Sequence, residues 1–252
     1  MTSLAVANAI AAPQDDVSRD SLSDQIYARL RVALMTGQYE PGSKLNIRKL
    51  AASYDMSPTP VREAIFQLVR EGALELRLGH QPRIPVLSIP QYINIRETRA
   101  PLERLAAELS AARIGAGEIE ELKRLHGLFI ESEKKQRFKE ALGANQEFHF
   151  TIYRASGNDV LVRVIENLWL LAGPLVNNQC PLEEELSPRV HPHVLIIDAL
   201  MRSSPAEAGE LVVRDLREGS YVIIEKLKKM LAQRTTRRKK PSSAGAKVRV
   251  TR

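Results

Sequence analysis

The sequence is poor in cysteine, in aromatic residues and in long apolar runs. Its one cysteine, Cys180, excludes a disulfide within the chain and fits a reducing compartment. Only 5% of the residues are aromatic, so aliphatic side chains must fill the core, which favours packed helices over a β-sandwich. No apolar run reaches the roughly 18 residues of a membrane span, and residues 4–12 lack the preceding basic residue of a signal peptide. We therefore expect a cytoplasmic protein that makes no membrane contact.

The net charge of +7 is concentrated at the C-terminal end. Residues 231–252 hold eight basic residues and no acidic one, and the rest of the chain is close to neutral, with 29 basic and 30 acidic residues. Within that body, residues 21–87 carry nine basic and six acidic residues. This local excess suits a phosphate-binding surface. We expect residues 1–20 to be a disordered leader and residues 232–252 to be a basic disordered tail.

Two short helices joined by a tight turn are predicted near the N-terminus. After a helix over 22–37, apolar spacing predicts helices over 47–53 and 58–70. Ser57 is a suitable N-cap for the latter, and Pro58 fits its first position, where a backbone N–H has no partner in any case. This arrangement is a helix-turn-helix. The segments 73–78 and 83–87 flank a Gly79-His80-Gln81-Pro82 turn and predict a small hairpin, or wing.

The chain after Ser88-Ile89-Pro90 has helical periodicity throughout. Six helices are predicted, over residues 91–113, 118–135, 138–156, 159–177, 187–202 and 205–231. The fold class is therefore mainly α. We expect a DNA-binding unit at 21–87 and an all-helical unit at 90–231.

The N-terminal motifs resemble those of the GntR family of bacterial regulators. They are Pro41-Gly42-Ser43-Lys44-Leu45, Leu50-Ala51 and Ser57-Pro58-Thr59-Pro60-Val61-Arg62-Glu63-Ala64. The helical half resembles the FCD type of effector domain, through Arg99-x-x-Leu102-Glu103, Phe148-His149, Ser156-Gly157-Asn158, and His193 with Ala199. The resemblance covers residues 22–230. It implies a cytoplasmic, nucleoid-associated regulator that binds double-stranded operator DNA as a homodimer, with repression as the expected output.

The resemblance places helix 58–70 in the major groove and the wing tip in the minor groove. Helical spacing puts Thr59, Arg62 and Phe66 on one face, where the Arg62 fork can reach a guanine edge or a phosphate. The other DNA-binding candidates lie around this helix. Arg48 is on the preceding helix, at a position that contacts DNA in the family, and Ser57 is the N-cap of helix 58–70. The wing adds Gly79, His80 and Arg83. Pro58 stands where the family usually has a base-reading arginine. An altered operator sequence is therefore expected.

Many FCD domains hold a divalent metal, and the matching positions here are Asn145, His149, His193 and Asp215. Asn145 and His149 are four residues apart and share a helix face. Two imidazoles and a carboxylate suit zinc first, with nickel, manganese or iron as alternatives. The alternative is that these residues only line a polar pocket. His191 is expected to point away from His193 on the same helix, and His126 and His80 are expected to be ordinary surface histidines.

In the FCD family the metal binds the carboxylate of a small organic acid. Arg99 is the expected charged partner of this effector, because a guanidinium fork fits a carboxylate. An ion pair with Glu103, four residues later, is the open alternative. Two other functions remain at this stage: a metal-responsive DNA-binding regulator without an organic effector, and an enzyme with a two-histidine, one-carboxylate iron site. The enzyme would normally need a β-barrel, for which the chain has no strands.

Overall fold

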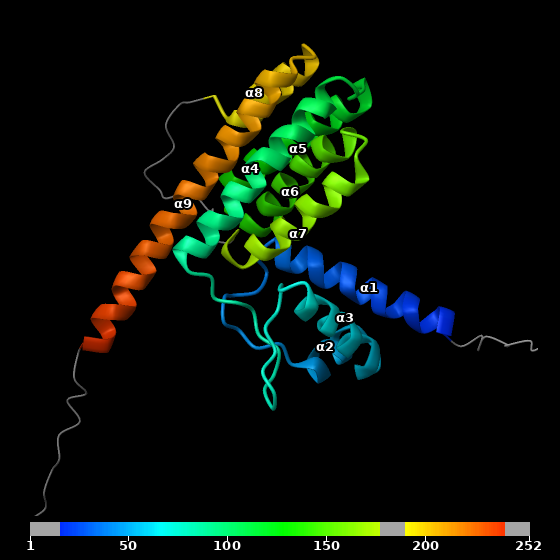
Figure 1. Ribbon diagram of the computed structural model, residues 1–252, viewed down its shortest axis with the longest axis vertical. Helices are drawn as coiled ribbons and strands as arrows, with labels where there is room; N and C mark the ends of the chain where they lie inside the picture. The colour runs from blue at the N-terminus through cyan, green and yellow to red at the C-terminus, as the bar shows by residue number, and fades with distance from the viewer. Residues whose placement is uncertain (1–15, 177–189, 240–252) are drawn as a thin grey trace, which may run out of the picture.

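The computed structural model describes residues 16–176 and 190–239, and within them the chain is almost entirely helical. Cys180, the expected helix start at residues 187–189 and the end of the basic tail lie outside the described residues. The described helices are α1 (Asp16–Met35), α2 (Ile47–Ser53), α3 (Pro58–Arg70), α4 (Ile89–Ala111), α5 (Ala116–Lys134), α6 (Phe138–Ala155), α7 (Asp159–Val176), α8 (Pro192–Met201) and α9 (Pro205–Lys239). They form a small head, α1 to α3, and a larger bundle, α4 to α9 (Figure 1).

The head is organised around the packing of α1 on α3. Buried side chains from one face of each helix form its core, namely Ile26, Leu30, Leu34, Val61, Ile65 and Leu68. The short helix α2 begins where the Asn46 side chain accepts a hydrogen bond from the backbone N–H of Lys49, an N-cap interaction. The helix-turn-helix predicted at 47–70 is therefore present with the expected bounds. The first helix was expected over 22–37 but begins at Asp16, so residues 16–20, expected in the disordered leader, are helical.

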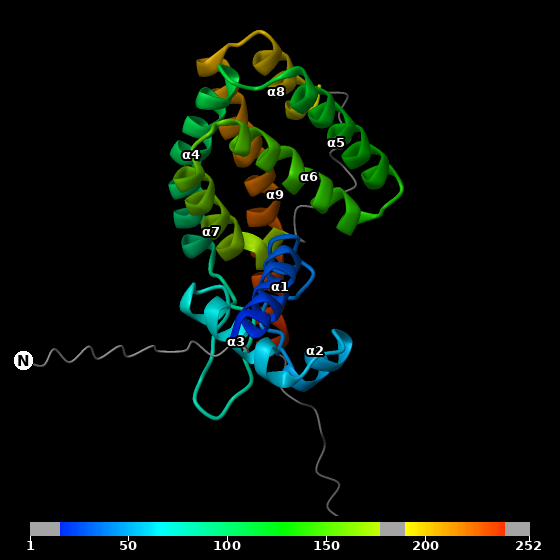
Figure 2. The ribbon, with the colours of Figure 1, turned by 90° about the vertical axis from the view of Figure 1, so that its right-hand side faces the viewer.

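The wing contains less regular strand than the sequence predicted. Glu75 and Arg83 exchange two backbone hydrogen bonds of 2.9 Å, and Arg83 also bridges to Lys44 on its other side. These are isolated antiparallel bridges, and no longer ladder forms among the described residues. Pro85 lacks a backbone donor, which limits the pairing that can continue beyond this point. The wing nevertheless protrudes from the end of the head that faces away from the bundle (Figures 1 and 2).

The bundle contains the six helices predicted from the sequence. Two helix ends differ from the prediction by several residues, and the others agree within two. α4 packs along α9, and α5 packs against α6 (Figure 2). α8 begins at Pro192, because proline fits the first helical position and His191 serves as its N-cap. α9 continues to Lys239, so residues 232–239, expected in the disordered tail, are helical. None of the described helices is long and apolar enough to cross a membrane.

The head and the bundle meet where α1 crosses α7. Gly173 of α7 lies so close to α1 that a Cβ there would be 2.2 Å from the Leu34 carbonyl oxygen. At the same junction Arg31 donates a 3.3 Å hydrogen bond to Asn167 and lies 3.6 Å from the Glu166 carboxylate. One hydrophobic core runs through both units without a break. The head is therefore packed directly onto the bundle.

We predict that Gly173→Ala lowers the free energy of unfolding by about 1–3 kcal/mol, because the added methyl group forces α1 and α7 apart. Gly143→Ala is the matched control, since Gly143 is also helical and a Cβ there meets nothing within 4 Å. The control should be neutral or slightly stabilising, as alanine is the better helix former. Urea denaturation of both variants measures the difference, and equal stabilities would contradict the close contact.

Candidate functional site

The exposed face of α3 carries the side chains expected to read DNA. Thr59, Arg62 and Phe66 are all exposed, and Arg48 is exposed on α2. Neither arginine pairs with a carboxylate among the described residues, so both guanidinium groups are free to bind phosphate or a base edge. Ser57 occupies the N-cap position, but its side chain makes no capping hydrogen bond. Its hydroxyl therefore remains free at the N-terminus of α3, where anions are favoured.

The wing places its candidates in different environments. Gly79 has a φ of 75°, a conformation that favours glycine, and it lies at the exposed tip beside exposed His80. Arg83 is already engaged, because its Nε donates a 2.8 Å hydrogen bond to Glu75 Oε2. Its part in DNA binding stays a prediction, with the ion pair as a competing partner.

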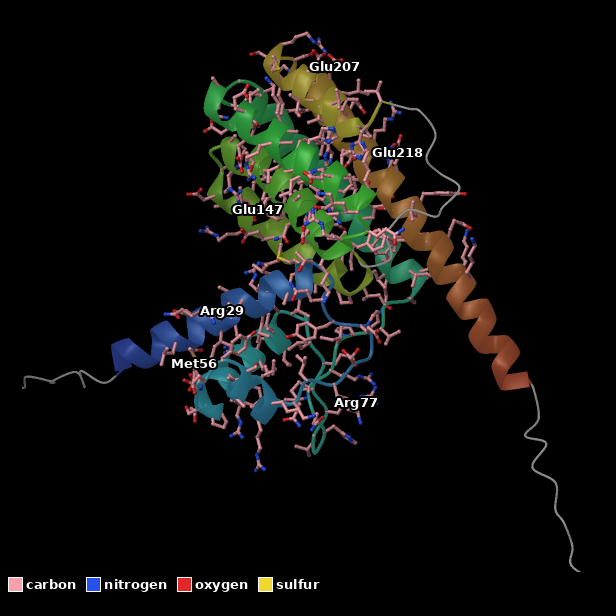
Figure 3. The ribbon with its side chains drawn as sticks, turned by 180° about the vertical axis from the view of Figure 1, so that it is seen from behind. Arg29, Met56, Arg77, Glu147, Glu207 and Glu218 are labelled. Atoms are coloured by element: carbon pink, nitrogen blue, oxygen red, sulfur yellow. The ribbon has the colours of Figure 1, made fainter. Side chains whose placement is uncertain are left out.

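Two exposed wing residues were missed by the sequence reasoning. Arg77 projects from the wing without an ion pair to another described residue (Figure 3). Leu78 is fully exposed next to the tip glycine. Their position just before Gly79 was the available signal, since residues flanking a turn glycine are carried outward with it.

Three of the four predicted metal ligands converge inside the bundle. One ligand atom each from His149 of α6, His193 of α8 and Asp215 of α9 lie within 4.8 Å of one another. His149 Nε2 is 3.0 Å from Asp215 Oδ2. Asn145 lies one helical turn before His149 and is half-buried, so its role as a fourth ligand stays a prediction.

The electrostatics of this cluster suit a divalent cation. His193 is buried and stacked on Phe148 with a centroid distance of 3.8 Å, and neither of its ring nitrogens has a hydrogen-bond partner. Burial lowers the pKa of His193 well below its usual range and keeps the ring neutral. Burial would raise the pKa of Asp215, but the hydrogen bond from His149 and the nearby imidazoles outweigh it and lower that pKa to about 2. The Asp215 carboxylate therefore lies beside a neutral imidazole whose ring nitrogens have no hydrogen-bond partner. This set of donor atoms fits a divalent metal.

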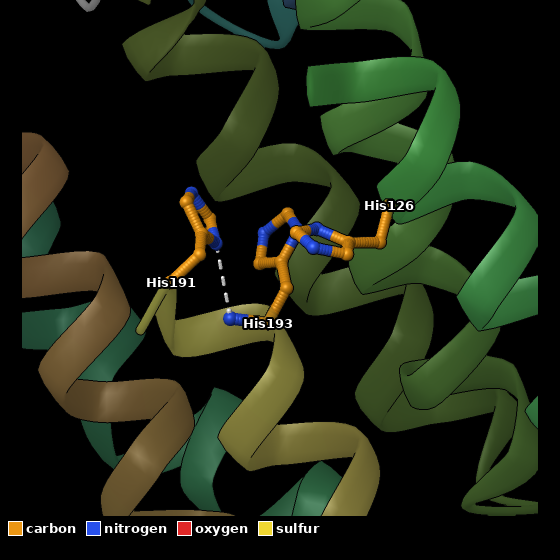
Figure 4. A group of neighbouring side chains, drawn as sticks. All are labelled: His126, His191 and His193. Carbon is orange, nitrogen blue, oxygen red and sulfur yellow. Dashed lines mark hydrogen bonds between the residues drawn. The ribbon is translucent and has the colours of Figure 1, made fainter. Parts of the chain in front are cut away.

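The expectations for His126 and His191 were wrong. One ring nitrogen each of His126, His191 and His193 also lie within 4.8 Å of one another (Figure 4). His191 precedes α8 rather than lying on it, and its Nδ1 accepts a 3.1 Å hydrogen bond from the backbone N–H of His193. This bond turns its ring towards His193. His126 is half-buried because α5 packs against α8. The sequence signal was Pro192, which marks the first residue of the helix.

Arg99 lies in a buried polar network next to the metal ligands. Its Nε donates a 2.7 Å hydrogen bond to Glu103 Oε1, and its guanidinium stacks over the Trp169 ring at 4.4 Å. Glu103 also accepts hydrogen bonds from Trp169 Nε1 at 2.7 Å and from the Tyr153 hydroxyl at 2.9 Å. The Tyr153 oxygen is 3.4 Å from His149 Nδ1, which links this network to the metal ligands. The ion pair between Arg99 and Glu103, which was the alternative to an effector-binding role, is therefore formed.

Ion pairing with Glu103 does not use all of the donors of Arg99. Among the described residues, its hydrogen bonding involves Nε alone. The two terminal nitrogens of the guanidinium remain available as donors. Together they can bind a carboxylate in a bidentate contact. The ion pair and a role in ligand binding are therefore compatible.

We predict that Glu103→Ala destabilises the fold by about 3–5 kcal/mol, because it leaves the Arg99 charge buried and unpaired. Glu108→Ala is the matched control, since Glu108 also pairs with an arginine four residues earlier on α4. The side chains of the first pair are 8% and 1% exposed, against 42% and 31% for the second, so solvent already screens the control pair. Thermal denaturation should separate the variants clearly, and similar losses in both would contradict the role of burial.

Comparisons with known proteins identify both units. The model of the bacterial regulatory proteins of the gntR family matches residues 22–80, and the FCD domain model matches residues 94–218. The transcriptional regulator McbR of Escherichia coli K12 is 30% identical over 154 residues, which cover 61% of this chain and 70% of McbR. The transcriptional repressor GlaR of the same organism is 26% identical over 199 residues, covering 75% and 90% of the two chains.

Solved structures agree with this assignment. E. coli McbR/YncC superposes with a TM-score of 0.75 and 25% identity, over 81% of this chain and 98% of that one. A GntR regulator from Rhodococcus sp. RHA1 has a TM-score of 0.65 at 20% identity over the same shares, which shows the common fold. The relatives are transcriptional regulators and not enzymes, so the iron-enzyme interpretation is set aside. The chain belongs to the GntR family of DNA-binding transcriptional regulators and carries an FCD domain behind its helix-turn-helix.

Proposed function

We propose that this regulator is a cytoplasmic homodimeric repressor whose operator binding is controlled by a small carboxylic acid. Each head would read one half-site, so the operator would be near-palindromic. Support for repression comes from relatives such as GlaR, which is named a repressor. The observation that carries the proposal is the convergence of His149, His193 and Asp215 next to the Arg99 network.

DNA recognition in this proposal depends on α3, α2 and the wing. Arg62 is the principal base or phosphate contact, because it is exposed and unpaired within the described chain. Thr59 and the free hydroxyl of Ser57 hold a phosphate at the start of α3, and Arg48 binds the backbone from α2. Pro58 has no side-chain donor, so more of the affinity falls to Arg62 and to the wing residues Gly79, His80 and Arg83.

Effector recognition in this proposal combines a metal with Arg99. His149, His193 and Asp215 would hold the ion, with Asn145 as a fourth ligand, and zinc is the first choice. When bound, the ion supplies a Lewis-acidic position for one carboxylate oxygen of the acid. Tyr153 fixes the orientation of the His149 ring through Nδ1. The terminal nitrogens of Arg99 would donate hydrogen bonds to the carboxylate of the acid.

A metal-responsive regulator without an organic effector is the second candidate. The ion pair between Arg99 and Glu103 favours it, because that pair already neutralises the guanidinium charge. In that case the metal itself would favour one arrangement of the heads over another.

We predict that Arg62→Ala weakens operator binding at least about tenfold, since each lost bidentate contact costs about 1–3 kcal/mol and a dimer loses two. Arg124→Ala is the control, because Arg124 is an exposed arginine on α5 of the bundle. Fluorescence anisotropy on DNA fragments recovered by genomic mapping of bound sites measures both. Equal affinities for the two variants would refute the assigned DNA face.

We predict that a small mono- or dicarboxylic acid raises the melting temperature of the zinc-loaded protein by several degrees, as about 2.7 kcal/mol is gained at a hundredfold excess over Kd. Arg99→Gln should abolish this shift, whereas Arg104→Gln, which alters the exposed neighbouring pair on α4, should retain it. A shift retained in Arg99→Gln would remove Arg99 from the site. DNA affinity that responds to zinc but to no acid would favour the metal-responsive alternative.

A further inference from the structure

We propose that this chain has a second position for a divalent metal, formed by three imidazoles from His126, His191 and His193. It is separate from the carboxylate-containing cluster of the proposed function and shares only His193 with it. The ring centroids lie 5.3 Å apart for His126 and His191, 5.5 Å for His126 and His193, and 4.4 Å for His191 and His193. The three rings come from α5 and from the start of α8 and face one another (Figure 4).

Unpartnered buried nitrogens distinguish this cluster from simple aromatic packing. His126 Nδ1 and both ring nitrogens of His193 are buried and have no hydrogen-bond partner among the described residues. A buried ring nitrogen normally has a hydrogen-bond partner, so three buried nitrogens without one in the same cluster require an explanation. A cation between the rings would satisfy one lone pair from each imidazole.

The three rings need only a small rearrangement to bind an ion. Tetrahedral zinc holds nitrogen at about 2.0–2.1 Å, which brings ligand nitrogens closer together than the 4.8 Å limit found here. His191 would give up the hydrogen bond that its Nδ1 accepts from the His193 N–H. That exchange replaces one capping bond at the start of α8 by a metal–nitrogen bond. The side chains are otherwise held by packing, including contacts of His191 and His193 with Phe129.

The shared His193 makes the two positions alternatives. A neutral imidazole carries one lone-pair nitrogen and one N–H, so it can serve one ion at a time. Each chain would then hold one ion, either beside Asp215 or between the three histidines. The second position has no carboxylate, so it suits zinc, nickel or copper and not manganese or magnesium, which prefer oxygen ligands.

Zinc and manganese binding to four full-length proteins tests this inference. The proteins are the wild type, Asp215→Asn, His126→Gln and the double variant, and equilibrium dialysis gives the stoichiometry and affinity for each metal. We expect one zinc per wild-type chain. Asp215→Asn should retain zinc but lose manganese, and His126→Gln should retain both. The double variant should bind zinc about a hundredfold more weakly than Asp215→Asn, since loss of an outer-shell partner alone costs 10–100-fold.

Copper EPR provides a second readout that does not depend on affinity. Nitrogen hyperfine structure should indicate three imidazoles in Asp215→Asn and fewer in the double variant. Arg124→Gln, which changes an exposed side chain of α5 two residues before His126, is the control for metal binding and should match the wild type. Circular dichroism of each variant verifies that it is folded.

Two results would overturn the inference. If Asp215→Asn alone loses zinc as completely as the double variant, the three-histidine position does not exist, although the metal site of the proposed function survives. If the double variant binds zinc as tightly as Asp215→Asn, His126 is not a ligand. A wild type that binds no divalent metal would overturn both the second position and the proposed metal site.

Discussion

The buried carboxylate of Glu103 is the interaction on which the interior of the bundle depends. It neutralises Arg99 of α4, accepts the indole N–H of Trp169 from α7 and accepts the Tyr153 hydroxyl from α6. A charge removed from water is tolerated only when it is paired and hydrogen-bonded, and Glu103 meets both conditions. One residue thereby fixes three helices relative to one another and sets the position of His149 through Tyr153.

The same network reaches the DNA-binding head through α7. Trp169 and Gly173 are four residues apart, so they lie on the same side of that helix. Trp169 contacts Glu103, and Gly173 lies against the backbone of Leu34 in α1. Because α1 packs on α3, a ligand that binds one placement of α7 better than another would change the relative populations of head orientations. The close approach at Gly173 leaves no side chain to absorb such a shift.

Local sequence signals predicted the positions of the helices well. They predicted less well which residues far apart in the sequence lie close together in the fold. The bounds of α2 and α3 follow from the Pro41-Gly42 turn, the Ser57 position and the apolar spacing, all of which act within a few residues. The convergence of His149, His193 and Asp215 was predicted through the family resemblance. His126 carries no local signal, because its proximity to His193 exists only after α5 packs on α8. His191 was misplaced because the helix start was assigned to Ser187-Pro188 instead of Pro192.

The fully exposed Leu78 at the wing tip affects how DNA affinity should respond to ionic strength. Phosphate contacts of the kind proposed for Arg62 and Arg48 would release counterions, and their contribution to affinity would weaken as salt is added. An apolar side chain buried against deoxyribose rings gains its free energy from displaced water, which salt does not screen. A complex that inserts Leu78 into the minor groove would therefore keep part of its affinity under conditions that remove nonspecific electrostatic attraction.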